Sequence, residues 1–216
     1  MNENRIEKKF VLGKYEENFI KKILIINGFK KSFPSRYISS IYLDTLNFDF
    51  AKDNINGVGK RKKIRFRWYN EDYKNIFLEE KNKQNFVVKK NINQLKNFRL
   101  EGNFVQNLKN YFFLDNKKYK DFNYRFVLKT NYLRSYWISE NKKIRATIDT
   151  NISTSPINDL NKKLNLSETI LEFKFSQNNE FFFRNFFYIK NLNLRSKKYS
   201  KYLQSFNLLE DSNLII

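Results

Sequence analysis

Charged and bulky apolar residues alternate one by one along several segments of this chain. In the segment KKIRFRWY (62–69), the cations Lys63, Arg65 and Arg67 alternate with apolar residues. Successive side chains of a β-strand point to opposite faces of the sheet, so this segment predicts a strand with one charged and one apolar face. A fold with many such strands must accommodate a charged face as well as bury an apolar one.

Four further segments divide their residues in the same way. Their charged faces carry Arg5, Glu7 and Lys9; Glu79, Lys81 and Lys83; Lys143, Arg145 and Asp149; and Glu172 and Lys174. Both signs of charge occur on each of these faces, whereas a surface that binds only nucleic acid would favour cations with aromatic residues. Carboxylates beside cations indicate a divalent ion held between protein oxygens and substrate phosphates. The alternative is that the acids form cross-strand ion pairs.

The periodicity of the whole chain predicts an α+β fold in a single domain, residues 1–216. Alternating segments predict strands at residues 5–12, 37–45, 62–69, 75–83, 125–138, 143–152 and 169–176. Apolar residues at helical spacing predict helices at residues 16–27, 181–192 and 198–209, and two short helices within residues 91–113. We expect mainly antiparallel strands with the helices packed outside.

Two arrangements of the charged faces satisfy this pattern. An open sheet would leave the charged face in water and pack its apolar face on helices. A closed sheet would turn the charged faces inward, with the helices covering the outside. Enclosing so much charge is costly unless a ligand or an ion neutralises it, so the pattern alone favours the open sheet.

The absence of two residue types narrows the chemistry. The chain contains no His and no Cys, which excludes Ser-His-Asp triads, thiolate nucleophiles, disulfides and most zinc sites. Catalysis would then depend on carboxylates, Lys, Arg, Tyr, hydroxyl groups or an oxygen-liganded metal. The net charge of +20 implies a polyanionic partner. No apolar run approaches the roughly 20 residues that span a bilayer, and no signal-peptide pattern opens the chain, so we expect a soluble cytoplasmic protein.

Eight short motifs follow one another along residues 3 to about 204: RIEKKF, SIYLDT, KKIRFRWY, LEEKNK, NYLRSYW, IRATIDT, ILEFKF and KKYSKYL. In this order they resemble the VTC domain, the catalytic domain of vacuolar-transporter-chaperone-type polyphosphate polymerases. That family belongs to the triphosphate tunnel metalloenzymes, together with the CYTH phosphatases and RNA triphosphatases. The resemblance implies an antiparallel eight-stranded β-tunnel with inward charged side chains, in place of the open sheet.

The resemblance also implies roles for individual residues. The catalytic cations would be Arg65, Arg67, Lys81, Arg134, Arg145 and Lys201. Further phosphate-binding residues would be Lys9, Lys63, Lys174 and, from the segment VVKKN, Lys89 or Lys90. Glu172 matches the metal-binding glutamate of the family, and Glu7 is a second acidic contributor. The expected ion is Mn²⁺ or Mg²⁺.

The activity that this resemblance implies is transfer of the ATP γ-phosphate onto a growing polyphosphate chain. With water as the acceptor, the same site would hydrolyse tripolyphosphate or a nucleoside triphosphate. A third hypothesis is a non-catalytic module that binds polyphosphate, inositol pyrophosphates or nucleic acid. ATP or another triphosphate and polyphosphate are the expected partners, ahead of nucleic acid, and a separate membrane protein is a further candidate partner that would take up the product.

Overall fold

The strands of this protein hydrogen-bond in an order that differs from their order in the chain. In the computed structural model, that order is β1 (Arg5–Gly13), β9 (Glu168–Ser176), β7 (Arg145–Pro156), β6 (Tyr124–Ser139), β2 (Phe29–Thr45), β3 (Lys60–Tyr69), β4 (Phe77–Gln84) and β5 (Val87–Gln94). The short strand β8 (Leu164–Asn165) pairs with β7. The structure describes residues 5–13, 16–85, 87–96, 98, 102–115, 119, 123–186 and 195–215.

The chain divides into two compact units. The first comprises residues 1–37, 132–152 and 165–199, and the second comprises residues 38–131, 153–164 and 200–216. Strands β2, β6 and β7 contribute residues to both units. The expectation of a single domain therefore stays a prediction.

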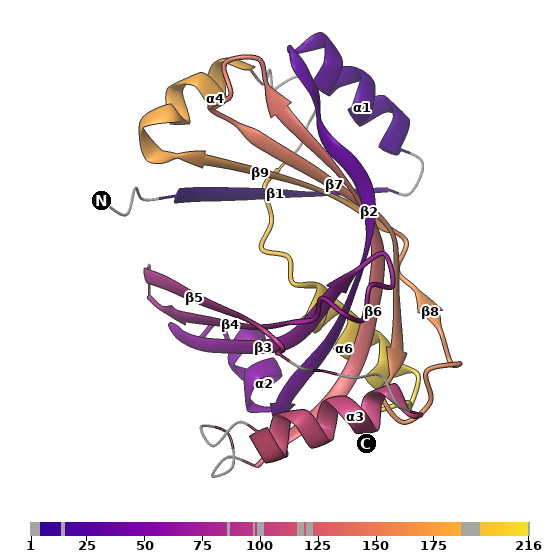
Figure 1. Ribbon diagram of the computed structural model, residues 1–216. Coiled ribbons are helices and arrows are strands. Elements are labelled where there is room, and N and C mark those ends of the chain that lie inside the picture. Colours follow the sequence, from indigo (N-terminus) through magenta and orange to yellow (C-terminus); the bar gives the residue numbers. More distant parts are fainter. Residues whose placement is uncertain are drawn as a thin grey trace. The chain divides into compact units, whose positions relative to one another are not determined.

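The first unit is a sheet with helices packed on one face. β9 pairs antiparallel with β1 on one side and with β7 on the other. Helices α1 (Glu17–Ile26) and α4 (Glu180–Phe186) lie on the same side of these strands (Figure 1), and a 3₁₀ turn precedes α4. Phe183 of α4 packs against Phe173 and Phe175 of β9, and Phe10 of β1 belongs to the same apolar core. The charged residues that alternate with this core lie on the opposite face of the strands.

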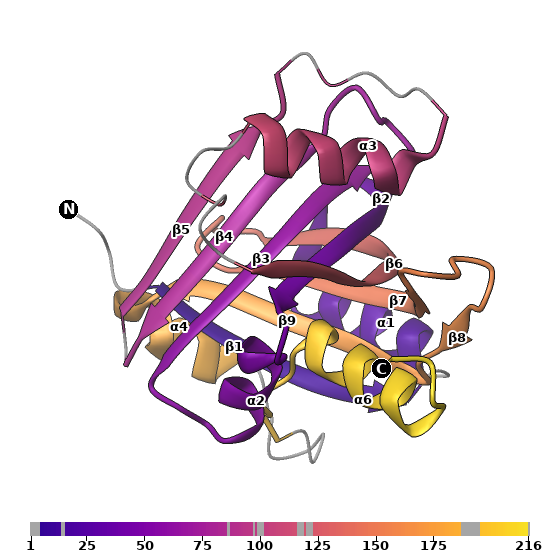
Figure 2. The same cartoon turned by 90° about the horizontal axis from the view of Figure 1, so that it is seen from below.

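The second unit repeats this division of faces. β3 pairs antiparallel with β2 and β4, and β4 pairs antiparallel with β5. Helix α3 (Phe104–Asn110), which a π-helical turn continues, lies across these strands (Figure 2). Its buried Leu108 joins Phe66 and Trp68 of β3 in the apolar core. The residues that alternate with Phe66 and Trp68, among them Arg65, therefore lie on the other face.

A buried carboxylate holds two further helices of the second unit in place. Asp44, at the end of β2, accepts hydrogen bonds from the backbone N–H groups of Phe50 (2.8 Å) and Ala51 (3.0 Å), which lie in the first turn of α2 (Asp49–Ile55). It also accepts a hydrogen bond from the hydroxyl of Tyr202, which lies in helix α6 (Lys201–Asp211). Burial raises the pKa of Asp44, although these hydrogen bonds oppose the rise. One side chain thus fixes both α2 and α6 to the sheet.

Most predicted elements are present, and the exceptions have a physical cause. β2 begins at Phe29, earlier than predicted. Its first half, FKKSFPSR, contains Pro34 and has no regular alternation, so this segment carries no strand signal. The helix predicted from residue 91 is wrong at its start, since residues 91–94 belong to β5. β5 is exposed along its whole length, so it has no apolar face that could produce an alternating pattern.

Three elements, α2, β5 and β8, were not predicted at all. The helix predicted over 181–192 is confirmed as far as Phe186 by α4, and its remaining residues lie outside the described part of the chain. None of the helices in the described ranges has both the length and the apolar character needed to cross a bilayer.

We expect Asp44→Asn to lower the free energy of unfolding by about 2 kcal/mol, because the amide nitrogen cannot accept the hydrogen bonds that a carboxylate oxygen accepts. Urea denaturation followed by circular dichroism would measure the change. The matched control is Asp211→Asn, at the exposed end of α6, and we expect a change within about 0.5 kcal/mol. Equal stabilities of the two variants would contradict the role given to Asp44.

Candidate functional site: two charged strand faces

The charged face of the first unit brings acids and bases together from four strands, β1, β9, β7 and β6. Lys9 of β1 lies opposite Glu172 of β9. In the neighbouring row, Glu7 of β1, Lys174 of β9 and Arg145 of β7 are in register. We call this set the Glu172 cluster, and it comprises Arg5, Glu7, Lys9, Arg134, Arg145, Asp149, Glu172 and Lys174.

Lys9 joins the two glutamates of this cluster. Its ammonium nitrogen lies 2.8 Å from a carboxylate oxygen of Glu7 and 3.5 Å from one of Glu172. It also donates a hydrogen bond to the backbone carbonyl of Tyr199 (3.2 Å). Burial lowers the pKa of Lys9, but the carboxylates of Glu172 and Glu7 outweigh it and hold the pKa above its ordinary value. Lys9 is therefore a fixed cation that keeps both carboxylates close together.

Arg134 of β6 is held by a carboxylate of β7. Its Nε and Nη2 atoms donate to the two oxygens of Asp149, with Nη2 at 2.7 Å from Oδ2. Asp149 is almost completely buried, at 1% exposure. Burial lowers the pKa of Arg134, but Asp149 outweighs it and raises the pKa well above the ordinary value. This two-point contact fixes the plane of the guanidinium group.

The carboxylates of this cluster fit a divalent ion only if a substrate supplies further oxygens. Within the described part of the chain, no group of three or more His, Cys, Asp or Glu side chains could hold a metal. Mg²⁺ is commonly bound by one or two carboxylates together with substrate phosphates and water. Glu172 and Glu7 provide such a pair. Oε1 of Glu172 is buried and forms an ion pair with the ammonium of Lys174.

The charged face of the second unit has a different balance of charge. Arg65 of β3 lies opposite Glu79 of β4, and the next row places Lys63, Lys81 and Lys90 side by side on β3, β4 and β5. We call this set the Glu79 cluster, and it comprises Lys63, Arg65, Arg67, Glu79, Lys81 and Lys90. Five cations therefore share this cluster with one carboxylate.

Glu79 contacts three of these cations. Its Oε2 lies 2.7 Å from Nε of Arg65 and 3.8 Å from Nη1 of Arg67, and its Oε1 lies 3.0 Å from Nζ of Lys90. Burial of Glu79, which is 6% exposed, would raise its pKa, but Arg65, Arg67 and Lys90 together lower the pKa to about 2. The pKa of Lys90 is lowered by its own burial, against the attraction of Glu79. Glu79 is thus a permanent anion that offsets part of the repulsion among the cations.

Neutral oxygens hold three of the cations without cancelling their charge. The Tyr42 hydroxyl lies 3.1 Å from Nη1 of Arg65, and the Ser40 hydroxyl lies 3.3 Å from Nε of Arg67. Nζ of Lys63 donates to the hydroxyl of Ser200 at 2.6 Å, and the same hydroxyl caps the start of α6. The cluster is therefore oriented but keeps its excess of positive charge.

The structure distributes the predicted site residues over these two clusters, with two exceptions. Lys90 belongs to the Glu79 cluster, whereas Lys89 lies opposite Asn82 on the other face of β4 and β5. This register settles which of the two lysines faces Glu79. Lys201 is the first residue of α6 and follows Ser200, the partner of Lys63.

Several residues that organise the clusters were not among the predicted site residues. Glu79 and Asp149 were assigned to charged faces, but the sequence did not show that they would be the counter-ions of specific arginines. The available signal was that Glu79 lies two residues from the face cation Lys81 and Asp149 lies four residues from Arg145. Ser40 and Tyr42 also lie on alternate positions of SIYLDT, but neutral hydroxyls do not mark a charged face.

Comparisons with known proteins agree with this fold. The family model of the VTC domain matches residues 4–210. Among solved structures, one match is the proposed adenylyl cyclase HpAC1 from Hippeastrum, in which a triphosphatase activity is dominant. The match has a TM-score of 0.59 and 10% identity, and it covers 94% of this chain and 96% of that chain. A proposed adenylate cyclase from Vibrio parahaemolyticus has a TM-score of 0.55 and 11% identity, with coverage of 95% and 99%.

The PH1819 protein from Pyrococcus horikoshii is similar with a TM-score of 0.51 and 14% identity, with coverage of 95% and 99%. No curated protein matches the chain. At such low identities the likeness to solved structures concerns the fold alone. It confirms the predicted fold class, and the family match confirms the predicted resemblance.

The depressed pKa of Glu79 predicts a specific loss of stability in acid. A carboxylate whose folded pKa is about 2 stabilises the folded state above its unfolded pKa of 4.5, and this contribution is lost as pH falls toward 2. The difference in unfolding free energy between the wild type and Glu79→Gln should therefore shrink by about 3 kcal/mol between pH 5 and pH 2. Urea denaturation at several pH values would measure this difference.

Glu210→Gln is the control for this measurement, because Glu210 is an exposed glutamate of α6. Its difference from the wild type should stay constant over the same range of pH. A constant difference for Glu79→Gln as well would show that Glu79 is not held as a carboxylate by the neighbouring cations.

Proposed function

We propose that this chain, which belongs to the VTC domain family, is a metal-dependent phosphotransferase that moves the γ-phosphate of ATP onto a growing polyphosphate chain. The observation that carries the proposal is the charge balance of the Glu79 cluster, in which five cations share a strand face with one carboxylate. Such an excess repels itself unless an anion of several charges binds to it. Triphosphates and polyphosphate are anions of this kind.

The geometry of the cluster supports binding to phosphate oxygens in particular. Arg65 and Arg67 are oriented by Glu79 and by the hydroxyls of Tyr42 and Ser40. Oriented guanidinium groups donate paired hydrogen bonds to phosphate oxygens. Cations that are fixed before the substrate arrives need little reorganisation as charge shifts during phosphoryl transfer. Arg65 and Arg67 therefore have the properties expected of catalytic residues.

The Glu172 cluster would hold the metal ion, either Mn²⁺ or Mg²⁺. Glu172 and Glu7 would supply its carboxylate ligands, and substrate phosphate oxygens would supply others. When bound, such an ion neutralises charge on the phosphates. Lys9 keeps the two carboxylates together, and Arg134, Arg145 and Lys174 add cations for phosphate oxygens in the same unit.

The reaction itself needs no general base from the protein. A terminal phosphate oxygen of the polyphosphate attacks the γ-phosphorus of ATP, the bond from that phosphorus to the bridging oxygen breaks, and ADP leaves with the electron pair. The attacking oxygen is already largely ionised at neutral pH. The residues of the chain would position the two phosphates and neutralise their charge, as phosphoryl transfer requires. The lack of His in the sequence is therefore compatible with this activity.

Hydrolysis of a triphosphate is the second candidate function. It would use the same cations, with water in place of the polyphosphate acceptor. The observation in its favour is the dominant triphosphatase activity of HpAC1 from Hippeastrum, which has a similar fold. The products distinguish the two reactions, since transfer yields long-chain polyphosphate and ADP, and hydrolysis yields orthophosphate.

The decisive test is incubation of the protein with ATP and Mn²⁺, followed by gel analysis of polyphosphate and an assay of orthophosphate. We expect long-chain polyphosphate. Orthophosphate alone would favour the hydrolase. The absence of both products would favour a binding module. Glu172→Gln should lower the metal-dependent rate by about a hundred-fold, because it removes a charged metal ligand. Glu180→Gln, which removes a glutamate paired with Lys8 and Arg184, is the control and should keep the wild-type rate.

Arg65→Ala should lower the affinity for ATP by about ten-fold or more, because it removes a charge-assisted hydrogen-bond donor. Isothermal titration calorimetry without metal would measure the affinity apart from turnover. Arg184→Ala is the matched control, since the Arg184 side chain is 71% exposed and pairs with Glu180 on its own helix. If both variants bound ATP as the wild type does, Arg65 would not be a phosphate ligand.

A further inference from the structure

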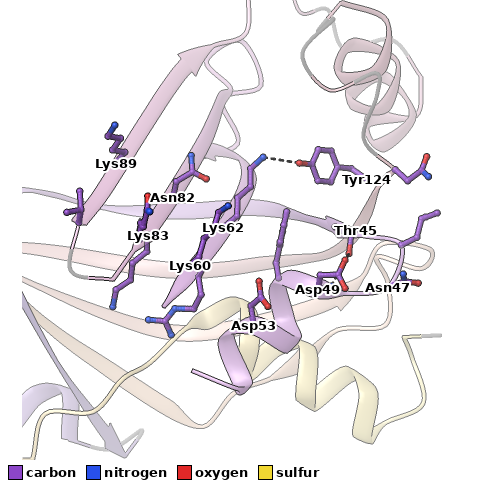
Figure 3. Close-up of a pocket in the computed structure, with 16 residues that line it drawn as sticks. Thr45, Asn47, Asp49, Asp53, Lys60, Lys62, Asn82, Lys83, Lys89 and Tyr124 are labelled. Atoms are coloured by element: carbon purple, nitrogen blue, oxygen red, sulfur yellow. Dashed lines mark hydrogen bonds between the residues drawn. The ribbon is translucent and has the colours of Figure 1, made fainter. Parts of the chain in front are cut away.

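We propose that a pocket beside α2 is a second anion-binding site, separate from the Glu79 cluster, for a compact molecule that carries two or more phosphate groups. The pocket lies entirely within the second unit and has a volume of about 670 Å³. This volume falls within the range of roughly 300 to 1,000 Å³ that is typical of small-molecule sites. Residues of β3, β4, β5 and α2 and the start of β6 line it (Figure 3).

The register of the strands separates this pocket from the Glu79 cluster. Lys62 of β3, Asn82 of β4 and Lys89 of β5 form one cross-strand row. Lys60 of β3 and Gln84 of β4 lie in the next row on the same face. The cations of the Glu79 cluster on β3 and β4 occupy the alternate positions, so they point to the opposite face of these strands. Lys60, Lys62 and Lys89 of the pocket therefore lie on the face away from the Glu79 cluster, whereas Arg61 and Lys83, which also line the pocket, lie on the face of the cluster.

The lining of the pocket has an excess of positive charge. Its cations are Lys60, Arg61, Lys62, Lys83 and Lys89, and its acids are Asp49 and Asp53. The carboxylate of Asp49 accepts a hydrogen bond from the hydroxyl of Thr45 (2.7 Å), which ties it to the end of β2. Among the described residues, neither Lys60 nor Lys89 has an ion-pair partner. An anion would thus gain attraction from several lysines at once.

One lysine of the pocket is held in position before any ligand binds. Nζ of Lys62 donates to the Tyr124 hydroxyl at 2.9 Å, and Figure 3 shows its ammonium directed toward that group. The same nitrogen lies 5.2 Å from the centre of the Tyr124 ring and 6.0 Å from that of Phe50. Restricting a flexible lysine in this way lowers the entropy that a ligand must remove on binding.

The aromatic residues of the pocket argue against recognition of a nucleobase. Tyr124 and Phe50 are 7% and 9% exposed, so their rings are not available for stacking on a ligand. Recognition would depend on ammonium groups and on side-chain amides such as Asn82. Lys62 and Lys89 lie on strands separated by β4, about 10 Å apart at the backbone. Two or more joined phosphates span such a separation better than a single phosphate does.

Two sources could supply this chemistry, namely free inorganic oligophosphate and a phosphorylated organic molecule. Inorganic tripolyphosphate and fructose 1,6-bisphosphate are suitable probes for the two sources. The test uses the full-length Arg65→Ala variant, in which phosphate binding at the Glu79 cluster is weakened. Lysine acetylation rates are measured by mass spectrometry with and without each probe. At least one probe should slow acetylation of Lys60 and Lys89 by about five-fold, since bound phosphate covers their ammonium groups.

Lys52 is the internal control for this footprint, because it is an exposed lysine of α2 that does not line the pocket. Its rate should stay unchanged. Equal protection of Lys52, Lys60 and Lys89, or no protection by either probe, would overturn the proposal. Protection by tripolyphosphate alone would identify an inorganic ligand, and protection by the bisphosphate would identify an organic one.

A double variant provides an independent measurement. Lys60→Gln/Lys89→Gln in the Arg65→Ala background should weaken binding of the protecting probe by about ten-fold in calorimetry, and Lys52→Gln should not. Both replaced lysines are exposed, so folding should be unaffected. Unchanged affinity of the double variant would refute the site. The proposal does not depend on the phosphotransferase activity, because binding here is read from lysines outside the two clusters.

Discussion

Repulsion among like charges on one strand face is the constraint on which the second unit depends. Arg65, Arg67 and Lys90 converge on Glu79, which is the one carboxylate of their cluster. Because the pKa of Glu79 is about 2, its negative charge persists at every pH at which the protein is expected to work. This single anion makes the arrangement of cations tolerable without neutralising it. The remaining positive charge is the driving force that we assign to phosphate binding.

The two clusters handle charge in different ways, and this difference suggests a division of tasks. In the Glu172 cluster, three carboxylates accompany five cations, and Lys9 and Arg134 each contact acids. Such a set suits a divalent ion, whose own charge would add to that of the cations. In the Glu79 cluster, hydroxyl groups orient the cations, so the excess charge is preserved. That set suits the phosphates themselves.

The sequence was sufficient to predict the faces of the strands but not their partners. Alternation placed Arg65 and Glu172 on charged faces because that signal is local and has a period of two. It could not decide between Lys89 and Lys90, because β5 is exposed on both faces and carries no apolar stripe. Pairing across strands, such as Arg134 with Asp149, depends on register between distant segments. The role of Asp44 escaped notice because a buried acid in SIYLDT has no periodic signature.

The position of β5 at one end of the strand order has a consequence for the behaviour of the protein in solution. The outer edge of an end strand offers unpaired backbone groups to other chains, and charged side chains such as lysine discourage that pairing. Lys89 and Lys90 provide this protection on both faces of β5. A phosphate-rich ligand that neutralises them would remove the barrier. The charge of these two lysines therefore serves to keep the edge strand from pairing as well as to attract anions.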